Sequence, residues 1–309
     1  MTELISGSLM DRTDILARFD REMRQDPPAE PGYRVEREGS IVRQVGEHAW
    51  ICYSHLTEVD APSVVAAEAA RFRRAGRTVE WKLYGHDGPP ALPGLLVAHG
   101  FVPDVPETLM VLDLEAPFDP GTRSATVEVQ EVTDRKGLEA AVAISRSAFA
   151  PGPGWDLEEY LPKLGTRTFA VFLATVEGRP VSAGRLDLPP GRSFASLWGG
   201  GTVPEFRGAG VYRALVAARR ERARSAGYRF LTVDARETSR PILERVGFRP
   251  LDPVVGWVLT PVPRAGGQGP SGDGANGSGA AGGTDSGSTT SPTSTSKPNP
   301  TSTWAPNIQ

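Results

Sequence analysis

The strongest constraint on this chain is an internal repeat of one pattern: a helix, a strand, a short helix, Gly-Phe and a further strand. In the first copy these elements are predicted over 62–75, 78–84, 92–98, 100–101 and 108–114. In the second copy they are predicted over 210–226, 229–235, 239–246, 247–248 and 256–259. Each long helix ends on an alanine-glycine pair, as expected when glycine supplies a left-handed C-cap. The shared order and spacing indicate a duplication.

The second copy has a complete set of elements upstream of the repeat. Alternating apolar residues predict a strand over 125–132, and Asp134 is placed to cap a helix that runs to about residue 149. A hairpin over 168–187 and a strand over 194–203 follow. Upstream of the first copy we expect a helix over 11–25 and strands over 33–38, 40–45 and 49–55.

These elements predict an α/β protein with a mixed, mostly antiparallel sheet flanked by helices, in two related copies. The predicted domains are 1–118 and 124–262, joined by a segment rich in Pro, Asp and Gly. Residues 264–309 form a Gly, Ser and Thr-rich tail with almost no core-forming residue, so we expect this tail to be disordered.

Composition excludes several classes of function. The net charge of −3 provides no basic field for nucleic acid. The one cysteine, Cys52, excludes an internal disulfide and a cysteine-rich metal site, and the four histidines lack ligand spacing, so we expect no metal. Without a secretory signal or an apolar run long enough to span a bilayer, we expect a cytoplasmic protein that binds no membrane.

The segment that carries chemistry joins a strand to a long helix. The strand ends at Val203, Pro204 follows, and a loop containing Gly208 and Gly210 leads directly into the predicted helix over 210–226. Unobstructed loop amides, together with the free N–H groups and the positive end of a helix, form an anion site. A diphosphate is the natural ligand of this geometry.

Here the chain resembles the GNAT superfamily of N-acetyltransferases. The family's Gln/Arg-x-x-Gly-x-Gly/Ala signature is matched by Arg207-x-x-Gly210-x-Tyr212, and its later Gly-Phe by Gly247-Phe248. The resemblance covers about residues 125–260 and implies an acetyl-CoA-dependent N-acyltransferase. It implies binding of the coenzyme A diphosphate at the loop amides and of the pantetheine arm at the strand edge near 201–203. The implied cofactor-binding residues are Thr202, Val203, Arg207, Gly208, Ala209, Gly210, Val211, Tyr212 and Ser239.

By the same resemblance, the acetyl group moves to a primary amine by direct attack, without a covalent enzyme intermediate. The acceptor is a small molecule or a peptide amine, and a homodimer is left open. The general-base candidates are Asp187, Asp234 and Glu205, with a water relay as the alternative. Trp198 and Gly200 are candidates for the acceptor pocket, the alternative being that Trp198 fills the core beneath a bulged strand.

The sequence departs from the family pattern at three positions. Tyr212 replaces a small residue, and we expect it to lie along the cofactor or the neighbouring sheet. Leu243 stands where many members have a tyrosine acid, and Arg236 replaces the usual asparagine. These losses leave a second hypothesis open, a catalytically weak acyl-CoA sensor or regulatory module.

The first copy lacks the loop altogether. Between Leu56 and the helix at Pro62 there is no glycine pair, and Glu58 and Asp60 would repel a diphosphate. We interpret it as a degenerate GNAT-like half that binds no coenzyme A and closes one side of the acceptor site. Within it, the stretch 81–87 ends a strand with polar groups, where pocket residues often lie.

Overall fold

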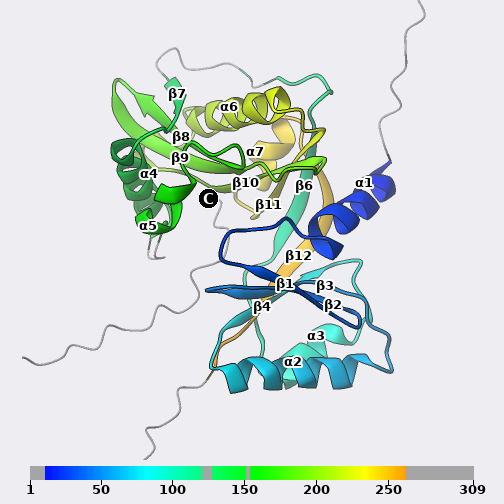
Figure 1. Ribbon diagram of the computed structural model, residues 1–309. Coiled ribbons are helices and arrows are strands. Elements are labelled where there is room, and N and C mark those ends of the chain that lie inside the picture. The colour runs from blue at the N-terminus through cyan, green and yellow to red at the C-terminus, as the bar shows by residue number, and fades with distance from the viewer. Residues whose placement is uncertain (1–10, 120, 122–126, 151–153, 262–309) are drawn as a thin grey trace, which may run out of the picture.

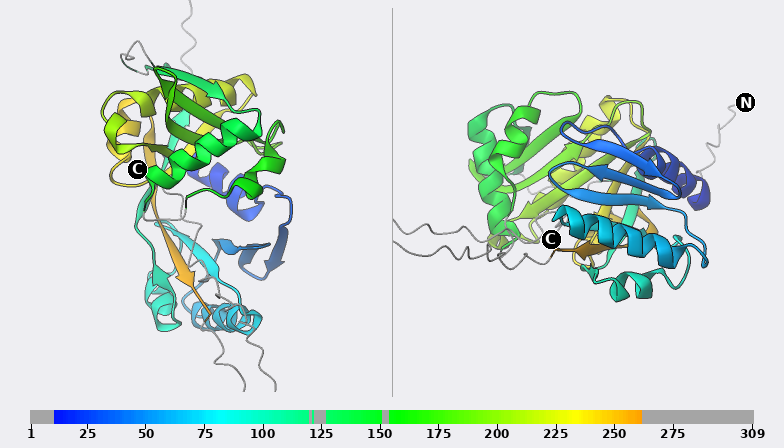
Figure 2. Two further views of the ribbon diagram at one scale, coloured as in Figure 1. Left: turned by 90° about the vertical axis from the view of Figure 1, so that its left-hand side faces the viewer. Right: turned by 60° about the horizontal axis from the view of Figure 1, so that its bottom comes forward.

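The computed structural model describes residues 11–119, 121, 127–150 and 154–261. The predicted tail and the beginning of the strand predicted over 125–132 lie outside these residues. We call residues 11–113 the first half and residues 127–261 the second half. The two halves lie one above the other, and strands β6 and β12 run between them (Figures 1 and 2).

The first half follows the predicted order of elements. Its N-terminal helix α1 (Arg12–Phe19) continues as a π-helical segment, Asp20–Gln25. The remaining elements are β1 (Arg34–Glu38), β2 (Ile41–Val45), β3 (Ala49–Ser54), α2 (Ala61–Ala75), β4 (Val79–Tyr84), α3 (Leu92–Ala98), β5 (Val102–Pro103) and β6 (Glu107–Asp113). The predicted C-cap of α2 is confirmed, since Gly76 has a φ of 63° in the left-handed region.

The second half contains every element predicted for it, together with the short helix α5 and two 3₁₀ turns, Leu161–Lys163 and Pro204–Phe206. Its elements are β7 (Val127–Glu131), α4 (Arg135–Ala148), α5 (Leu157–Tyr160), β8 (Phe169–Val176), β9 (Arg179–Asp187), β10 (Phe194–Thr202), α6 (Val211–Ser225), β11 (Phe230–Ala235), α7 (Arg240–Arg245) and β12 (Arg249–Leu259). The Asp134 side chain accepts from the Gly137 amide at 2.7 Å, which confirms the predicted cap. The short α5 was not predicted, and β12 begins seven residues earlier than the strand predicted over 256–259.

All these strands form one sheet, in the order β1-β2-β3-β4-β12-β6-β11-β10-β9-β8-β7, with β5 paired to β12. The last strand of each half therefore lies in the sheet of the other half. β6 pairs antiparallel with β11 from Thr108↔Ala235 to Asp113↔Phe230, whereas β12 pairs with β4 from Val254↔Tyr84 to Leu259↔Val79. The sequence predicts each final strand but gives no indication of this exchange, which makes the two halves one continuous sheet.

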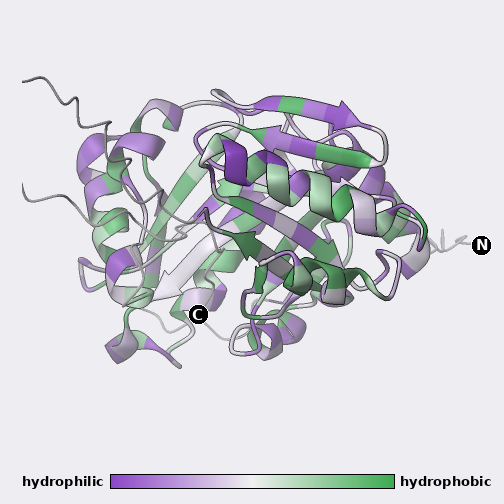
Figure 3. Ribbon diagram, turned by 90° about the horizontal axis from the view of Figure 1, so that it is seen from below, coloured by the Kyte–Doolittle hydropathy of each residue, from purple (hydrophilic) through white to green (hydrophobic). Residues whose placement is uncertain are grey.

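Helices cover both faces of this sheet. In the second half, α4 and α6 both contact β8, β9 and β10, and they enclose the largest hydrophobic core. In the first half, α2 buries Ala61, Val65, Ala69 and Phe72 at helical spacing, and both apolar and polar residues occur along the helix (Figure 3). A third core lies beneath α1, where Ile15 and Phe19 pack on strands of both halves.

An ionic network fixes the N-terminal helix across the junction of the halves. Arg24 is fully buried and pairs with Asp87 at 2.6 Å. His86 contacts Asp20 through Nε2 at 2.8 Å and Asp252 of β12 through Nδ1 at 2.7 Å. Hydrogen bonds that the imidazole donates to these two carboxylates raise the pKa of His86 to about 9, so the imidazole is a cation at neutral pH. The network thus joins the N-terminal helix, the first half and the exchanged strand β12.

Candidate active site

The loop between β10 and α6 has the geometry expected of an anion site. Val203 is followed by a 3₁₀ turn over Pro204–Phe206, and Gly208 and Gly210 have φ of 79° and 80°. Residues 207–209 are exposed. The first helical hydrogen bond of α6 runs from the Ala214 amide to the Gly210 carbonyl at 3.1 Å, so the amides of the preceding turn have no acceptor within the helix. Free amides and the positive helix end therefore face outward together.

Two side chains of the predicted loop turn back onto the protein. The Arg207 Nε donates to the Thr202 carbonyl at 3.1 Å, so this side chain fastens the loop to the end of β10. Tyr212 is 8% exposed and lies against Gly200 of β10, the sheet alternative of the two expected placements. Burial raises the pKa of Tyr212, and the neighbouring Arg219 guanidinium lowers it by a smaller amount. The loop therefore presents main-chain groups outward.

The parallel strands β10 and β11 separate next to the β10–α6 loop. Parallel β10 and β11 are paired only from Phe194↔Phe230 to Ser196↔Thr232. Beyond Ser196, β10 pairs with β9 alone, and its register shifts between Trp198 and Gly201. The edge of β10 that faces β11 is thus unpaired over the residues that lead to the loop, as an added extended ligand requires.

The three glycines of β10 make room for protein side chains. A Cβ on Gly199 would lie 2.5 Å from the Trp155 indole nitrogen, and one on Gly201 would lie 2.7 Å from the Ala148 Cβ. Gly200, a predicted pocket residue, faces the opposite way, where a Cβ would lie 2.9 Å from the Tyr212 ring. The absence of a side chain at Gly200 therefore lets the first turn of α6 pack against the sheet.

A row of polar side chains crosses one face of the sheet where β10 and β11 separate. The Ser196 and Thr232 hydroxyls lie 3.0 Å apart at the last paired residues. Asp187 is paired with Ser196, Arg185 with Trp198, and Asp234 follows Thr232 by two residues. Paired residues and residues two apart share a face of a sheet. We call the set Arg185, Asp187, Ser196, Trp198, Thr232 and Asp234 the polar row.

The first half extends the polar row. Lys82 of β4 reaches across to Asp234, with Nζ 2.5 Å from Oδ2. The Lys82 ammonium also lies 5.5 Å from the centroid of the Trp198 ring, and the Arg185 guanidinium lies 5.7 Å from it. Trp198 is therefore held by two cations, one from each half. Arg185 in turn donates a short hydrogen bond to the Tyr160 hydroxyl of α5.

Glu107 of β6 lies on the same face. β6 pairs Leu109 with Asp234, so Glu107, two residues earlier, is Asp234's diagonal neighbour. The Glu107 Oε1 lies 3.7 Å from the Arg236 Nε. Glu80, two residues before Lys82, lies over Gly256 of β12, where a Cβ would meet the Glu80 Oε1. The strand exchange thus brings acids of the first half beside β11.

Three of these carboxyls titrate near neutrality. Burial raises the pKa of Asp187 to about 6, opposed by the Arg185 cation. Burial likewise raises the pKa of Glu80 to about 7, and that of Glu107 to about 8, opposed in both by Lys82. A carboxyl that exchanges a proton near pH 7 suits acid–base chemistry, and such groups gather at functional sites.

The other predicted site residues lie apart from this row. Glu205 is exposed in the turn before the loop. Thr202 is buried and bonds to the Ser182 hydroxyl at 2.9 Å, while the Val203 amide bonds to β9. Ser239 is fully buried at the start of α7, and its hydroxyl bonds to the Arg236 carbonyl at 3.1 Å.

Sequence reasoning missed Arg185, Glu80 and Glu107 as neighbours of the site. Lys82 was indicated only as part of the polar stretch 81–87. No spacing in the chain relates these residues to Asp234, because the exchange of β6 and β12 brings them together. Alternation of polar and apolar residues along β4, where Trp81 and Leu83 are buried in the core, was the one available signal.

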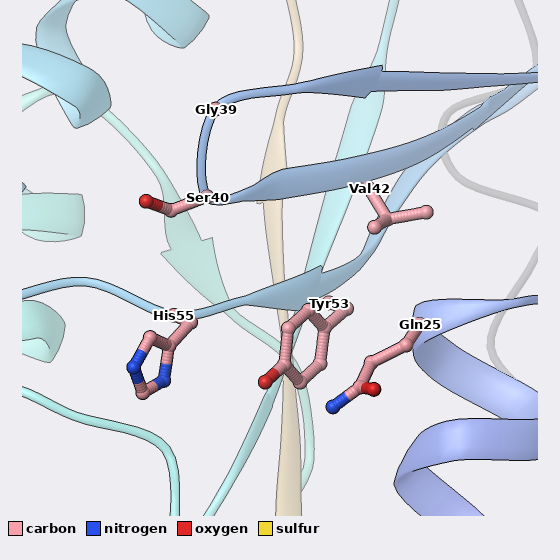
Figure 4. Close-up of a pocket in the computed structure, with 6 residues that line it drawn as sticks. All are labelled: Gln25, Gly39, Ser40, Val42, Tyr53 and His55. Atoms are coloured by element: carbon pink, nitrogen blue, oxygen red, sulfur yellow. The ribbon is translucent and has the colours of Figure 1, made fainter.

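Within the described part of the chain, no group of three His, Cys, Asp or Glu side chains is placed to hold a metal ion, and no helix is long and apolar enough to cross a bilayer. A hollow of about 400 Å³ is lined by Gln25, Gly39, Ser40, Val42, Tyr53 and His55 (Figure 4). It belongs to the first half, and none of its lining residues is in the polar row.

The family model for the acetyltransferase (GNAT) family matches residues 138–248. These residues are a GNAT domain. The match begins in α4, includes the β10–α6 loop and ends at Gly247-Phe248, so it covers the segments on which the resemblance was based. The family supports acyl transfer in general. No curated protein matches the chain.

Solved structures show the same fold over most of the chain. A GCN5-related N-acetyltransferase from Kribbella flavida is 17% identical, with a TM-score of 0.59 over 80% of this chain and 93% of that one. A GCN5-related N-acetyltransferase from Sphaerobacter thermophilus is 14% identical, with a TM-score of 0.56 over 72% of this chain and 77% of that one. A tandem GNAT protein from the clavulanic acid biosynthesis pathway is 18% identical, with a TM-score of 0.52 over 75% of this chain and 84% of that one. The first half thus resembles a GNAT fold as well.

Proposed function

We propose that the protein transfers an acetyl group from acetyl-CoA to a primary amine. The observation that carries the proposal is the exposed glycine loop at the start of α6, beside the point where β10 and β11 separate. The diphosphate binds at the amides of this loop, and the pantetheine arm follows the unpaired edge of β10 toward Trp198. The thioester then lies beside the polar row.

The acceptor approaches from the face of the sheet that carries the polar row. Its nitrogen lone pair attacks the thioester carbon, so that a C–N bond forms and the C–S bond breaks with the electron pair leaving on sulfur. Of the two base candidates in the row, Asp187 has its pKa raised to about 6 by burial, and Asp234 is held by Lys82. The protein positions the amine and accepts its proton, and direct transfer needs no covalent enzyme intermediate.

Acetyl-CoA binding tests the loop assignment. Substituting Gly210→Trp places a large side chain on a residue whose φ is 80° and obstructs the amides, so calorimetry should detect no acetyl-CoA binding. The control is Gly191→Ala, because Gly191 has a similar φ of 70° and open space around its Cβ position in another turn. Retained binding by Gly210→Trp would show that the loop is not the diphosphate site.

A second function is favoured by one residue. Leu243 is fully buried in the hydrophobic core, at the position where the family resemblance places a tyrosine acid. An acyl-CoA sensor requires binding without a proton donor for the thiolate. Thiol release measured over a panel of amines separates the two functions, since tight acetyl-CoA binding with no release for any amine would identify a sensor.

A further inference from the structure

Two buried carboxylate oxygens on the face of the sheet that carries the polar row have no hydrogen-bond donor among the described residues. They are Asp234 Oδ1 and Glu107 Oε1. Asp234 as a residue is 7% exposed, and the Glu107 side chain is 10% exposed. A buried acceptor left without a donor is costly, and natural proteins rarely leave one unless a ligand or water supplies the donor.

The two oxygens belong to neighbouring strands of different halves. Asp234 lies on β11 and is paired with Leu109, so Glu107 is its diagonal neighbour on β6, about 7 Å away between side-chain origins. A group with several donors can bridge two carboxylates at this spacing. A primary ammonium carries three N–H donors and a positive charge.

The charges around the two oxygens favour a cation. The groups that face Glu107 are Glu80 and Lys82 of β4 and Asp234 and Arg236 of β11. With Glu107 itself, the cluster has three carboxyls and two cations. Lys82 contacts the other oxygen of Asp234, and Arg236 stays 3.7 Å from Glu107. When all three carboxyls are ionised, the cluster carries one more negative than positive charge. Burial first, and repulsion from Asp234 and Glu80 second, raise the pKa of Glu107 to about 8, and a bound ammonium would favour the ionised carboxylate.

We propose that Asp234 Oδ1 and Glu107 Oε1 form the seat of the acceptor's ammonium group, so that the first half supplies one of the two oxygens that hold the amine. The inference rests on the proposed function and specifies its substrate class: an amine that arrives as a cation. The first half is then part of the acceptor site, although it has no coenzyme A loop of its own.

The proton balance of the reaction assigns a role to each oxygen. The bound ammonium transfers one proton to the Glu107 carboxylate and becomes a nucleophilic amine that Asp234 still holds. Attack on the thioester forms the C–N bond and breaks the C–S bond. A second amine proton goes to the departing thiolate, and Glu107 releases the first to solvent. Ammonium and thioester thus give amide, thiol and one free proton.

Binding of amines and of their neutral isosteres tests the seat without requiring turnover. The probes are 2-phenylethylamine, n-hexylamine and 1,4-diaminobutane, each compared by calorimetry with its matching alcohol on the full chain in the presence of coenzyme A. The unmodified protein is expected to bind at least one amine tenfold or more tightly than its alcohol. Equal binding of every pair, or no binding by any amine, would overturn the proposal.

Substitutions test whether the preference for amines over alcohols depends on these two oxygens. Glu107→Gln and Asp234→Asn should each reduce amine affinity about tenfold and leave alcohol affinity and acetyl-CoA affinity within twofold. The control Glu115→Gln removes the same charge from a side chain that is 75% exposed just beyond β6, and should bind like the unmodified protein. Melting temperatures show whether each variant is folded. A folded Glu107→Gln with full amine preference would refute the seat.

The pH profile distinguishes a proton-accepting role from a structural one. With amine and acetyl-CoA both present, Glu107→Gln should lower kcat/KM for the amine and remove the acidic limb that this carboxyl sets, without changing KM for acetyl-CoA. An unchanged profile would contradict the role of Glu107. If the unmodified protein prefers amines but releases no thiol, the proposed transferase function fails while the ammonium seat stands, so the two failures are distinguishable.

Discussion

The two halves differ most at the connection between a strand and the long helix that follows it. In the second half, this connection contains Gly208 and Gly210 in left-handed conformations and leaves its last amides facing outward. In the first half, the corresponding residues Leu56–Asp60 close on themselves, since the Asp60 carboxylate accepts from the Thr57 amide at 2.6 Å. One connection leaves amides facing outward, whereas the other bonds an amide to its own carboxylate.

The two halves also differ beyond the last paired residues of their parallel strands. β3 and β4 are paired only at Trp50↔Glu80 and Ile51↔Trp81. Beyond these pairs, the Trp81 indole donates to the Ser54 hydroxyl at 3.3 Å, and the ring is fully buried. A side chain thus bridges the strands of the first half beyond their last pair. In the second half, the last bridge is the Ser196–Thr232 pair at the final paired residues.

The first half has no such glycine loop, yet it is part of the same sheet as the second half. Its strand β6 lies in the middle of the sheet beside β11, and its residues Lys82 and Glu107 lie beside Asp234. The first half therefore lacks the glycine loop of the second half, but it supplies a strand that completes the sheet.

The largest effect is expected from removal of the first half. Deletion of residues 1–120 removes β6, which pairs with β11 at six residues and separates it from β12. We expect the remaining chain to lose its cooperative thermal transition, measured by circular dichroism, because a central strand is missing from its sheet. A chain that lacks only residues 1–10 is the control. A soluble, cooperatively melting fragment 121–309 would show that the second half is an independent domain.

Removing Lys82 breaks the ion pair between the halves. Lys82→Met leaves the Asp234 carboxylate buried without its cation, which should lower the free energy of unfolding by roughly 3 kcal/mol. Urea denaturation of Lys82→Met, Asp234→Asn and the double variant measures the coupling. If the effects of the two single substitutions simply add, the pair does not join the halves energetically.

An acidic residue in the β10–α6 loop tests whether charge accounts for the difference between the two connections. Ala209→Asp puts a carboxylate in the exposed loop, where repulsion of a diphosphate should cost about 1 to 2 kcal/mol, or roughly five- to thirtyfold in acetyl-CoA affinity. The neutral Ala209→Asn is the matched variant. Titrations at low and high salt measure the effect, which should shrink at high salt. Equal affinities of the two variants would mean that no anion binds there.

The smallest expected effect concerns the contact of α1 with both halves. The folded pKa of His86 is raised to about 9 from an ordinary value of about 6.5, so its stabilisation is complete below pH 6.5 and is lost as pH rises through 9. His86→Gln should therefore lower the free energy of unfolding by about 1 kcal/mol at pH 6, a value discounted for solvent access to the ring. At pH 10 the variant and the unmodified protein should unfold alike. A constant difference across this range would indicate a packing effect.

The glycine loop at the start of α6 could be predicted from the sequence because its requirements are local. Gly208, Gly210 and the start of α6 lie within a few residues of one another, and backbone geometry over that distance follows from residue type. The helices and strands of the repeat were predictable for the same reason, since alternation and capping are properties of adjacent residues. Three acid-base candidates were proposed from the sequence, and the structure places two of them, Asp187 and Asp234, in the polar row.

The sequence by itself thus determined the duplication, the order of elements and the loop at the start of α6. Only the tertiary structure decided which strand completes which half, because β6 and β12 each meet the local requirements of either sheet. That choice depends on contacts between residues more than a hundred positions apart, such as Lys82 with Asp234. The same long-range pairing brings Glu107 beside Asp234, so the proposed acceptor site depends on the exchange of two strands.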